Sequence, residues 1–184
     1  MQSITSSFSR TVAKGRRPLI LLSFVVIVAA ILAGTFSPPD PSLAQEVEAL
    51  AQDVQASGYM AIFFNNAILA VTFLVPLLGL GTALMSSFTT GAALSAIAQQ
   101  AGASPQMLFL LTVVMPHSVI EFFAYSLVLS ENIVIMQKLL SRKGINEEVG
   151  PLVASLVLAL FLLVVAMVVE VLTGQLLTAM VSPV

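Results

Sequence analysis

Long apolar runs separated by short polar connections dominate this chain. The hydrocarbon core of a bilayer, about 30 Å thick, is crossed by about 20 helical residues, and a helix pairs its own backbone groups where water is absent. The pattern therefore predicts an all-α fold, a polytopic transmembrane helix bundle that forms one domain over residues 1–184. About five spans are predicted, at residues 18–36, 58–76, 81–99, 107–129 and 151–171.

The one long polar stretch, residues 42–57, is predicted to be a short amphipathic helix outside the membrane. Ser42 and Gln45 have the spacing of a capping box, which stabilises the first turn of a helix. The apolar residues of the stretch fall on one helical face, as expected for a helix that lies on a surface. They are Leu43, Val47, Leu50 and Val54.

The first apolar run has two interpretations. Basic residues precede it and Ser42-Leu43-Ala44 follows it, which is the arrangement of a secretory signal peptide with its cleavage site. The run over residues 18–36 is longer than the apolar region of a signal peptide, which has about 7 to 15 residues. We therefore expect an uncleaved membrane anchor.

The charge distribution predicts the orientation of the spans. The segment from Asp40 to Asp53 carries acidic residues and no basic ones, so under the positive-inside rule it lies outside and the N-terminus is cytoplasmic. An odd number of spans places both basic clusters on the cytoplasmic side, whereas a re-entrant segment at residues 81–99 would separate them. The clusters are Arg10, Lys14, Arg16 and Arg17, then Lys138, Arg142 and Lys143.

Composition supports a membrane protein and excludes other classes. Charged residues make up 9% of the chain and hydrophobic residues 58%, compared with roughly 25% charged residues in a soluble domain. The formal net charge of −2 provides no basic field, so nucleic-acid binding is not expected. The chain has no cysteine and one histidine, which excludes disulfides and Cys-ligated metals, and no cofactor or metal is expected.

Two polar pairs lie inside the predicted spans, where polar residues are costly. His117 and Glu121 are four residues apart on one helix face, directly after Pro116, which is expected to kink the fourth span. Asn65 and Asn66 in the second span are their expected partners in one buried polar cluster. The cluster is either a hydrogen-bonded clip between helices, which we favour, or a pair that binds a proton or a ligand.

The position of a residue along its span predicts its depth. Counted from about Ser104 at the outer side, Glu121 is expected ~25 Å deep, toward the cytoplasm. Glu170, ~30 Å from Gly150, is expected to be an interfacial carboxylate on the outer side. Only His117 and Glu121 are therefore expected to be ionisable groups deep in the bilayer.

The third predicted span is only weakly apolar, but small residues recur in it every four positions. This pattern lets two helices approach closely in lipid, and the hydroxyls of such a span need polar partners. We expect the span to be packed among other helices or at a subunit contact, through Ala83, Ser87, Gly91 and Ser95.

Several of these features occur together between Phe63 and Tyr125: Asn65-Asn66, Gly79, Gly81, Thr90-Gly91 and Pro116-His117-Ser118-Val119-Ile120-Glu121. In this combination the sequence resembles the stage II sporulation protein M family. The resemblance implies a polytopic membrane protein of bacteria or archaea. In endospore formers it also implies a membrane organiser that acts with two partner proteins in peptidoglycan remodelling, and not the hydrolase itself.

The expected function is a non-enzymatic integral membrane scaffold of the cell membrane. It contacts membrane lipids and binds other membrane proteins or a second copy of itself through its small-residue faces. The alternative is a small-solute or ion transporter or channel that uses the polar site of His117 and Glu121. An intramembrane hydrolase is disfavoured, because the sequence has no His-Glu-x-x-His motif.

Overall fold

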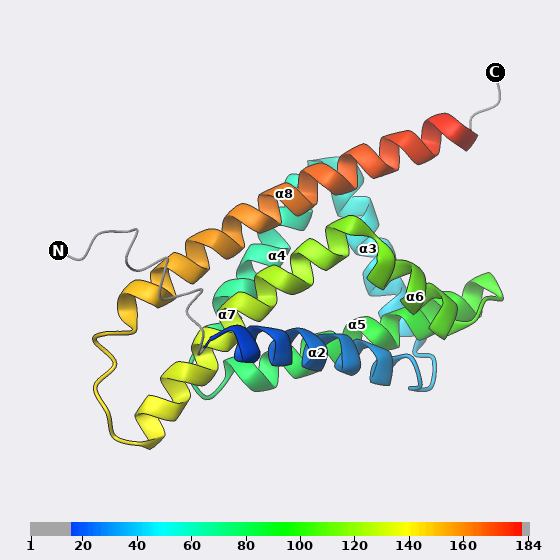
Figure 1. Cartoon of the computed structure of the whole chain (residues 1–184). Helices are drawn as coiled ribbons and strands as arrows, with labels where there is room; N and C mark the ends of the chain where they lie inside the picture. Colours follow the sequence, from blue (N-terminus) through cyan, green and yellow to red (C-terminus); the bar gives the residue numbers. More distant parts are fainter. Residues whose placement is uncertain (1–15, 182–184) are drawn as a thin grey trace.

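The protein is built from helices packed side by side (Figure 1). The computed structural model describes residues 16–181, without the side chains of residues 50, 51, 53–57 and 176–181, so Arg10 and Lys14 of the first basic cluster lie outside the described residues. Every regular element in this part of the chain is an α-helix, which confirms the predicted all-α class. The helices are α2 (Arg17–Gly34), α3 (Pro41–Ser57), α4 (Met60–Phe73), α5 (Gly79–Ala101), α6 (Pro105–Val114), α7 (Pro116–Leu140) and α8 (Val149–Val181).

Four of these helices, α2, α5, α7 and α8, are long and apolar enough to cross a membrane. Helices α4 and α6 are apolar but shorter, with 14 and 10 residues. A polytopic membrane helix bundle is therefore confirmed, with four long spans and two short apolar helices in the region of the five predicted spans.

The predicted fourth span, residues 107–129, is wrong as a single helix. Helix α6 ends at Val114, Met115 has an extended backbone with ψ 130°, and α7 begins at Pro116. Proline disfavours helical geometry in the residue before it but fits the first turn of the helix that it opens. The chain therefore breaks here instead of kinking, and α6 and α7 run in different directions (Figure 1).

The predicted second span, residues 58–76, is longer than the helix that forms there. Helix α4 ends at Phe73, so its 14 residues extend about 21 Å. The chain then turns through Pro76 and Leu77, and the φ of 70° at Leu77 lies in the left-handed region that a branched side chain rarely adopts.

The turn between α4 and α5 is fastened to α7. Asn132, which is fully buried, donates a hydrogen bond from Nδ2 to the carbonyl oxygen of Val75 at 2.8 Å. The backbone N–H of Leu77 donates to Met136 Sδ at 3.0 Å. A Cβ at Gly79 would lie 2.6 Å from the same Asn132 amide nitrogen, so this close approach requires glycine.

Helix α5 packs along α2 through its small residues. Ala83, Ser87, Gly91 and Ser95 are all buried. The two backbones meet where Gly91 faces Gly34, and a Cβ at Gly91 would lie 1.9 Å from the carbonyl oxygen of Ile31. Further along, Ser95 Oγ donates to the carbonyl oxygen of Ser37 at 3.1 Å. This face of α5 is thus covered by a helix of the same chain.

Helix α7 is the central helix of the bundle. Helices α2, α4 and α8 pack against it, and within the described residues α2 and α8 contact α7 but not each other. The core around it contains aromatic side chains, including Phe73 and Tyr125, whose ring centres are 5.4 Å apart in an edge-to-face arrangement. Because α7 lies between α2 and α8, these two helices leave a space on one side of it.

Helix α3 coincides with the predicted amphipathic helix and packs on α4 and α5. The predicted capping box is wrong, because the Ser42 hydroxyl donates to Asp40 Oδ1 at 2.8 Å and the Ser42 backbone N–H donates to the same atom at 2.9 Å. These hydrogen bonds lower the pKa of Asp40, an efficient helix-capping residue. The location of α3 outside the membrane stays a prediction.

Candidate functional site

One polar contact joins α4 to α7. Asn66 donates a hydrogen bond from Nδ2 to Glu121 Oε1 at 2.8 Å, and the pair is partly buried. Glu170 on α8 is close enough for its charge to act on Glu121. The hydrogen bond thus joins two helices that are distant in sequence, with the charge of a third helix nearby.

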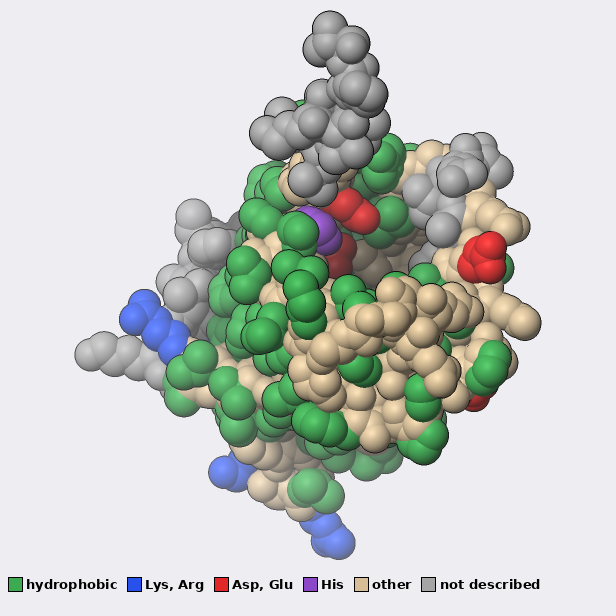
Figure 2. All heavy atoms as spheres, turned by 90° about the vertical axis from the view of Figure 1, so that its right-hand side faces the viewer, with side chains coloured by type: hydrophobic (Ala, Val, Ile, Leu, Met, Phe, Trp, Pro, Cys, Tyr) green, Lys and Arg blue, Asp and Glu red, His purple; other side chains and the backbone are tan. Residues whose placement is uncertain are grey.

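His117 lies one turn before Glu121 on α7, so both project from the same helix face. Its Nδ1 atom is buried and has no hydrogen-bond partner in the described part of the chain. Figure 2 shows the histidine and acidic side chains gathered beside a hollow. Among the described residues, no group of three or more metal-binding side chains is placed to hold a metal ion.

Asn65 does not join this cluster. Successive helical residues point about 100° apart, and Asn65 faces a different groove, between α3, α4 and α5. The expectation of one cluster with both asparagines is therefore wrong for Asn65. The groove has a volume of about 570 Å³ and is lined by Leu43, Glu46, Val47, Asn65, Leu69, Thr82, Met85, Ser86, Thr89, Thr90 and Ala93.

Hydroxyl groups of α5 form one wall of the α3–α4–α5 groove. Thr82 and Thr90 donate their hydroxyl protons to backbone carbonyls one turn earlier, both at 3.0 Å. Such bonds satisfy the donor of each hydroxyl and leave its oxygen able to accept a hydrogen bond. The wall therefore offers acceptors beside the amide of Asn65, which can both donate and accept.

A second polar cluster was missed by the sequence analysis. Glu131 on α7 is fully buried, and its Oε1 atom lies 2.9 Å from Arg16 Nε, at the start of α2. The same oxygen accepts a hydrogen bond from Ser155 Oγ of α8 at 3.1 Å. One carboxylate thus links three helices.

The second cluster extends to the connection between α7 and α8. Arg16 also pairs with Glu148, and Lys138 Nζ lies 2.5 Å from Glu148 Oε1. Burial alone would raise the pKa of Glu148, but the hydrogen bonds and positive charges of Lys138 and Arg16 outweigh it and hold the pKa below its ordinary value. The basic residues interpreted as an orientation signal therefore also stabilise the fold.

The break at Pro116 changes the expected depths. Glu121 follows the start of α7 by five residues, about 7.5 Å, whereas Glu131 follows it by fifteen, about 22 Å. The depth expected for Glu121 assumed one continuous helix from Ser104, and that assumption is wrong because α6 ends at Val114. Glu131 is the carboxylate farther along α7, and the signal that would have found it is its position between two apolar runs of the sequence, residues 127–129 and 133–135.

Comparison with known proteins identifies a family. The sequence matches the family model described as Stage II sporulation protein M over residues 19–173, which is most of the chain. Comparisons with curated proteins and with solved structures found no match. The matched range includes Asn66, Glu121 and Glu131.

Proposed function

Since the chain belongs to the stage II sporulation protein M family, we propose that it is a non-enzymatic scaffold of the cell membrane that binds a transmembrane helix of a partner protein. The docking surface is the α3–α4–α5 groove. Its lining combines hydroxyl, amide and small side chains of α4 and α5 with apolar residues and with Glu46 of α3, and the polar and small side chains support this proposal. Such residues are typical of helix contacts in lipid, where a close backbone approach and interhelical hydrogen bonds replace the hydrophobic effect.

The other faces of the bundle narrow the choice of docking surface. The small-residue face of α5 is filled by α2, so it is not available to a second copy of the chain. Large apolar side chains cover the outward faces of α8, among them Val157 and Phe161. These faces suit lipid, whereas polar groups facing lipid without a partner are unfavourable.

The proposed orientation has the N-terminus in the cytoplasm. Arg16 and Lys138 belong to one ionic cluster and therefore lie at the same end of the bundle. A single cysteine at Ser141 should resist an impermeant maleimide in intact cells, whereas one at Gln52 should react. The reverse labelling would overturn the orientation.

A site-specific crosslinker tests the docking surface. A photoreactive amino acid at Met85, which lines the groove and is 67% exposed, should form an adduct with a membrane segment of another protein. Thr89→Leu should reduce the yield of that adduct about fivefold, the effect of one interhelical hydrogen bond of ~1 kcal/mol. The same probe at Phe161 is the control. Adducts with lipid alone at both positions would contradict docking.

A transporter is the second candidate, and one observation favours it. The buried Nδ1 of His117 has no hydrogen-bond partner among the described residues and lies on the same helix face as Glu121. Imidazole and carboxylate groups can pass a proton or hold a cation. Proton or ion flux through liposomes that disappears in Glu121→Gln would reject the scaffold and establish transport.

A further inference from the structure

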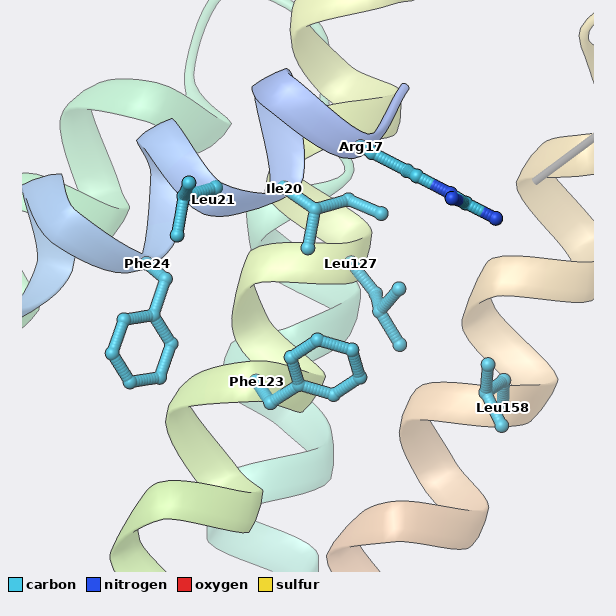
Figure 3. Close-up of a pocket in the computed structure, with 7 residues that line it drawn as sticks. All are labelled: Arg17, Ile20, Leu21, Phe24, Phe123, Leu127 and Leu158. Atoms are coloured by element: carbon cyan, nitrogen blue, oxygen red, sulfur yellow. The ribbon is translucent and has the colours of Figure 1, made fainter. Parts of the chain in front are cut away.

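A hydrophobic groove lies between α2 and α8. Its floor is α7, because α2 and α8 each pack on α7 and, in the described residues, not on one another. The groove has a volume of about 520 Å³. Figure 3 shows its apolar lining converging from three helices: Ile20, Leu21 and Phe24 from α2, Phe123 and Leu127 from α7, and Leu158 from α8.

We propose that this groove binds an anionic phospholipid, with an acyl chain between α2 and α8 and the phosphate on the guanidinium of Arg17. Arg17 is the charged residue among the described residues that line the groove, and its side chain reaches across one end of it toward α8 (Figure 3). A guanidinium can donate two parallel hydrogen bonds to a phosphate. Basic pockets between spans on the cytoplasmic side are sites where anionic headgroups bind.

The two adjacent arginines at the start of α2 have different positions. Arg16 is turned inward, where it pairs with Glu131 of α7 and with Glu148 at the start of α8. Arg17 lies about 100° further round the helix, at the mouth of the groove. Arg16 joins α2 to the floor of the groove and to the start of its opposite side, so the opening is formed before any ligand enters.

The chemistry of the groove favours an acyl chain over a partner helix. Its apolar lining has none of the small or hydroxyl-bearing side chains that helix pairs use, in contrast to the α3–α4–α5 groove.

Fluorescence quenching in bilayers tests the site. The chain has no tryptophan, so Phe123→Trp creates a single reporter on the floor of the groove. The full-length protein is placed in phosphatidylcholine vesicles that contain a small fraction of either phosphatidylglycerol or phosphatidylcholine with brominated acyl chains. We expect about fivefold preferential quenching by the phosphatidylglycerol, the contribution of one basic residue near an anionic lipid.

Matched variants make the result specific. Phe161→Trp, on an exposed part of α8, should show no lipid preference. Arg17→Gln should abolish the preference at Phe123→Trp, Arg17→Lys should retain part of it, and Arg142→Gln should leave it unchanged. Equal quenching by both lipids at Phe123→Trp, or a preference that survives Arg17→Gln, would overturn the proposal. Weak quenching by both lipids would show that protein covers the groove, which also overturns it.

Discussion

Removal of Arg16 is predicted to be the most damaging single change in the ionic cluster. The Glu131 side chain has 0% exposure and that of Arg16 has 13%, so Arg16→Gln would leave a buried carboxylate without its opposite charge. Breaking a buried pair in this way costs about 3–5 kcal/mol. Glu131→Gln should cost less, about 1–3 kcal/mol, because Arg16 keeps Glu148 as a partner and loses one charged hydrogen bond.

Equilibrium unfolding of the purified protein in detergent micelles, followed by circular dichroism, measures these differences. The double variant with both substitutions should lose less than the sum of the single losses, because the residues share one interaction. Lys143→Gln, at an exposed position in the same connection, is the control and should change stability by less than about 0.5 kcal/mol. Additive losses, or an Arg16→Gln loss no larger than the control, would refute the reasoning.

Three further predictions concern other contacts. The pKa of Glu148 in the folded protein is lower than its ordinary value of 4.5. The stability that its charge contributes is therefore fully present above pH 4.5 and is lost as the pH falls through the pKa of the folded protein. Glu148→Gln should make the melting temperature fall less steeply at acid pH. Gly91→Ala should sharply reduce the yield of folded protein, because its Cβ meets a backbone carbonyl of α2, whereas Gly81→Ala, with nothing within 4 Å, should express normally. The melting temperature of Glu121→Gln should be close to that of the parent protein and that of Glu121→Leu several degrees lower, since only the glutamine retains an acceptor for Asn66. Equal melting temperatures of the two variants would contradict this.

The sequence predicted best those helices whose own length and hydropathy determine where they begin and end. Residues 18–36 and 81–99 form α2 and α5 almost over the predicted ranges, because a continuous apolar or small-residue run has no competing structure. Pro116 was less informative, since a proline is compatible with either a kink in one helix or the first turn of another. Here Pro116 opens a new helix, and α6 packs against α5 and α2. The pattern of a single sequence does not contain this packing.

The polar contacts divide in the same way. Helical spacing placed His117 and Glu121 on one face, and an asparagine of α4 does reach Glu121. Which of the two asparagines does so depends on the rotation of α4 about its axis, which no local pattern sets. The pairing of Arg16 with Glu131 is harder to predict from sequence, because it links the start of α2 to the second half of the chain and no residue spacing indicates it.

The long separation in sequence between Arg16 and its partners has a consequence for biogenesis. At about 5–20 residues per second, the ribosome needs roughly 6 to 23 s after synthesising Arg16 to reach Glu131, and Glu148 and Ser155 come later still. The first span therefore enters the bilayer before its ion-pair partners exist. It waits with the arginine at the polar interface until α7 and α8 arrive, so assembly of the bundle is completed only after α8 has been synthesised.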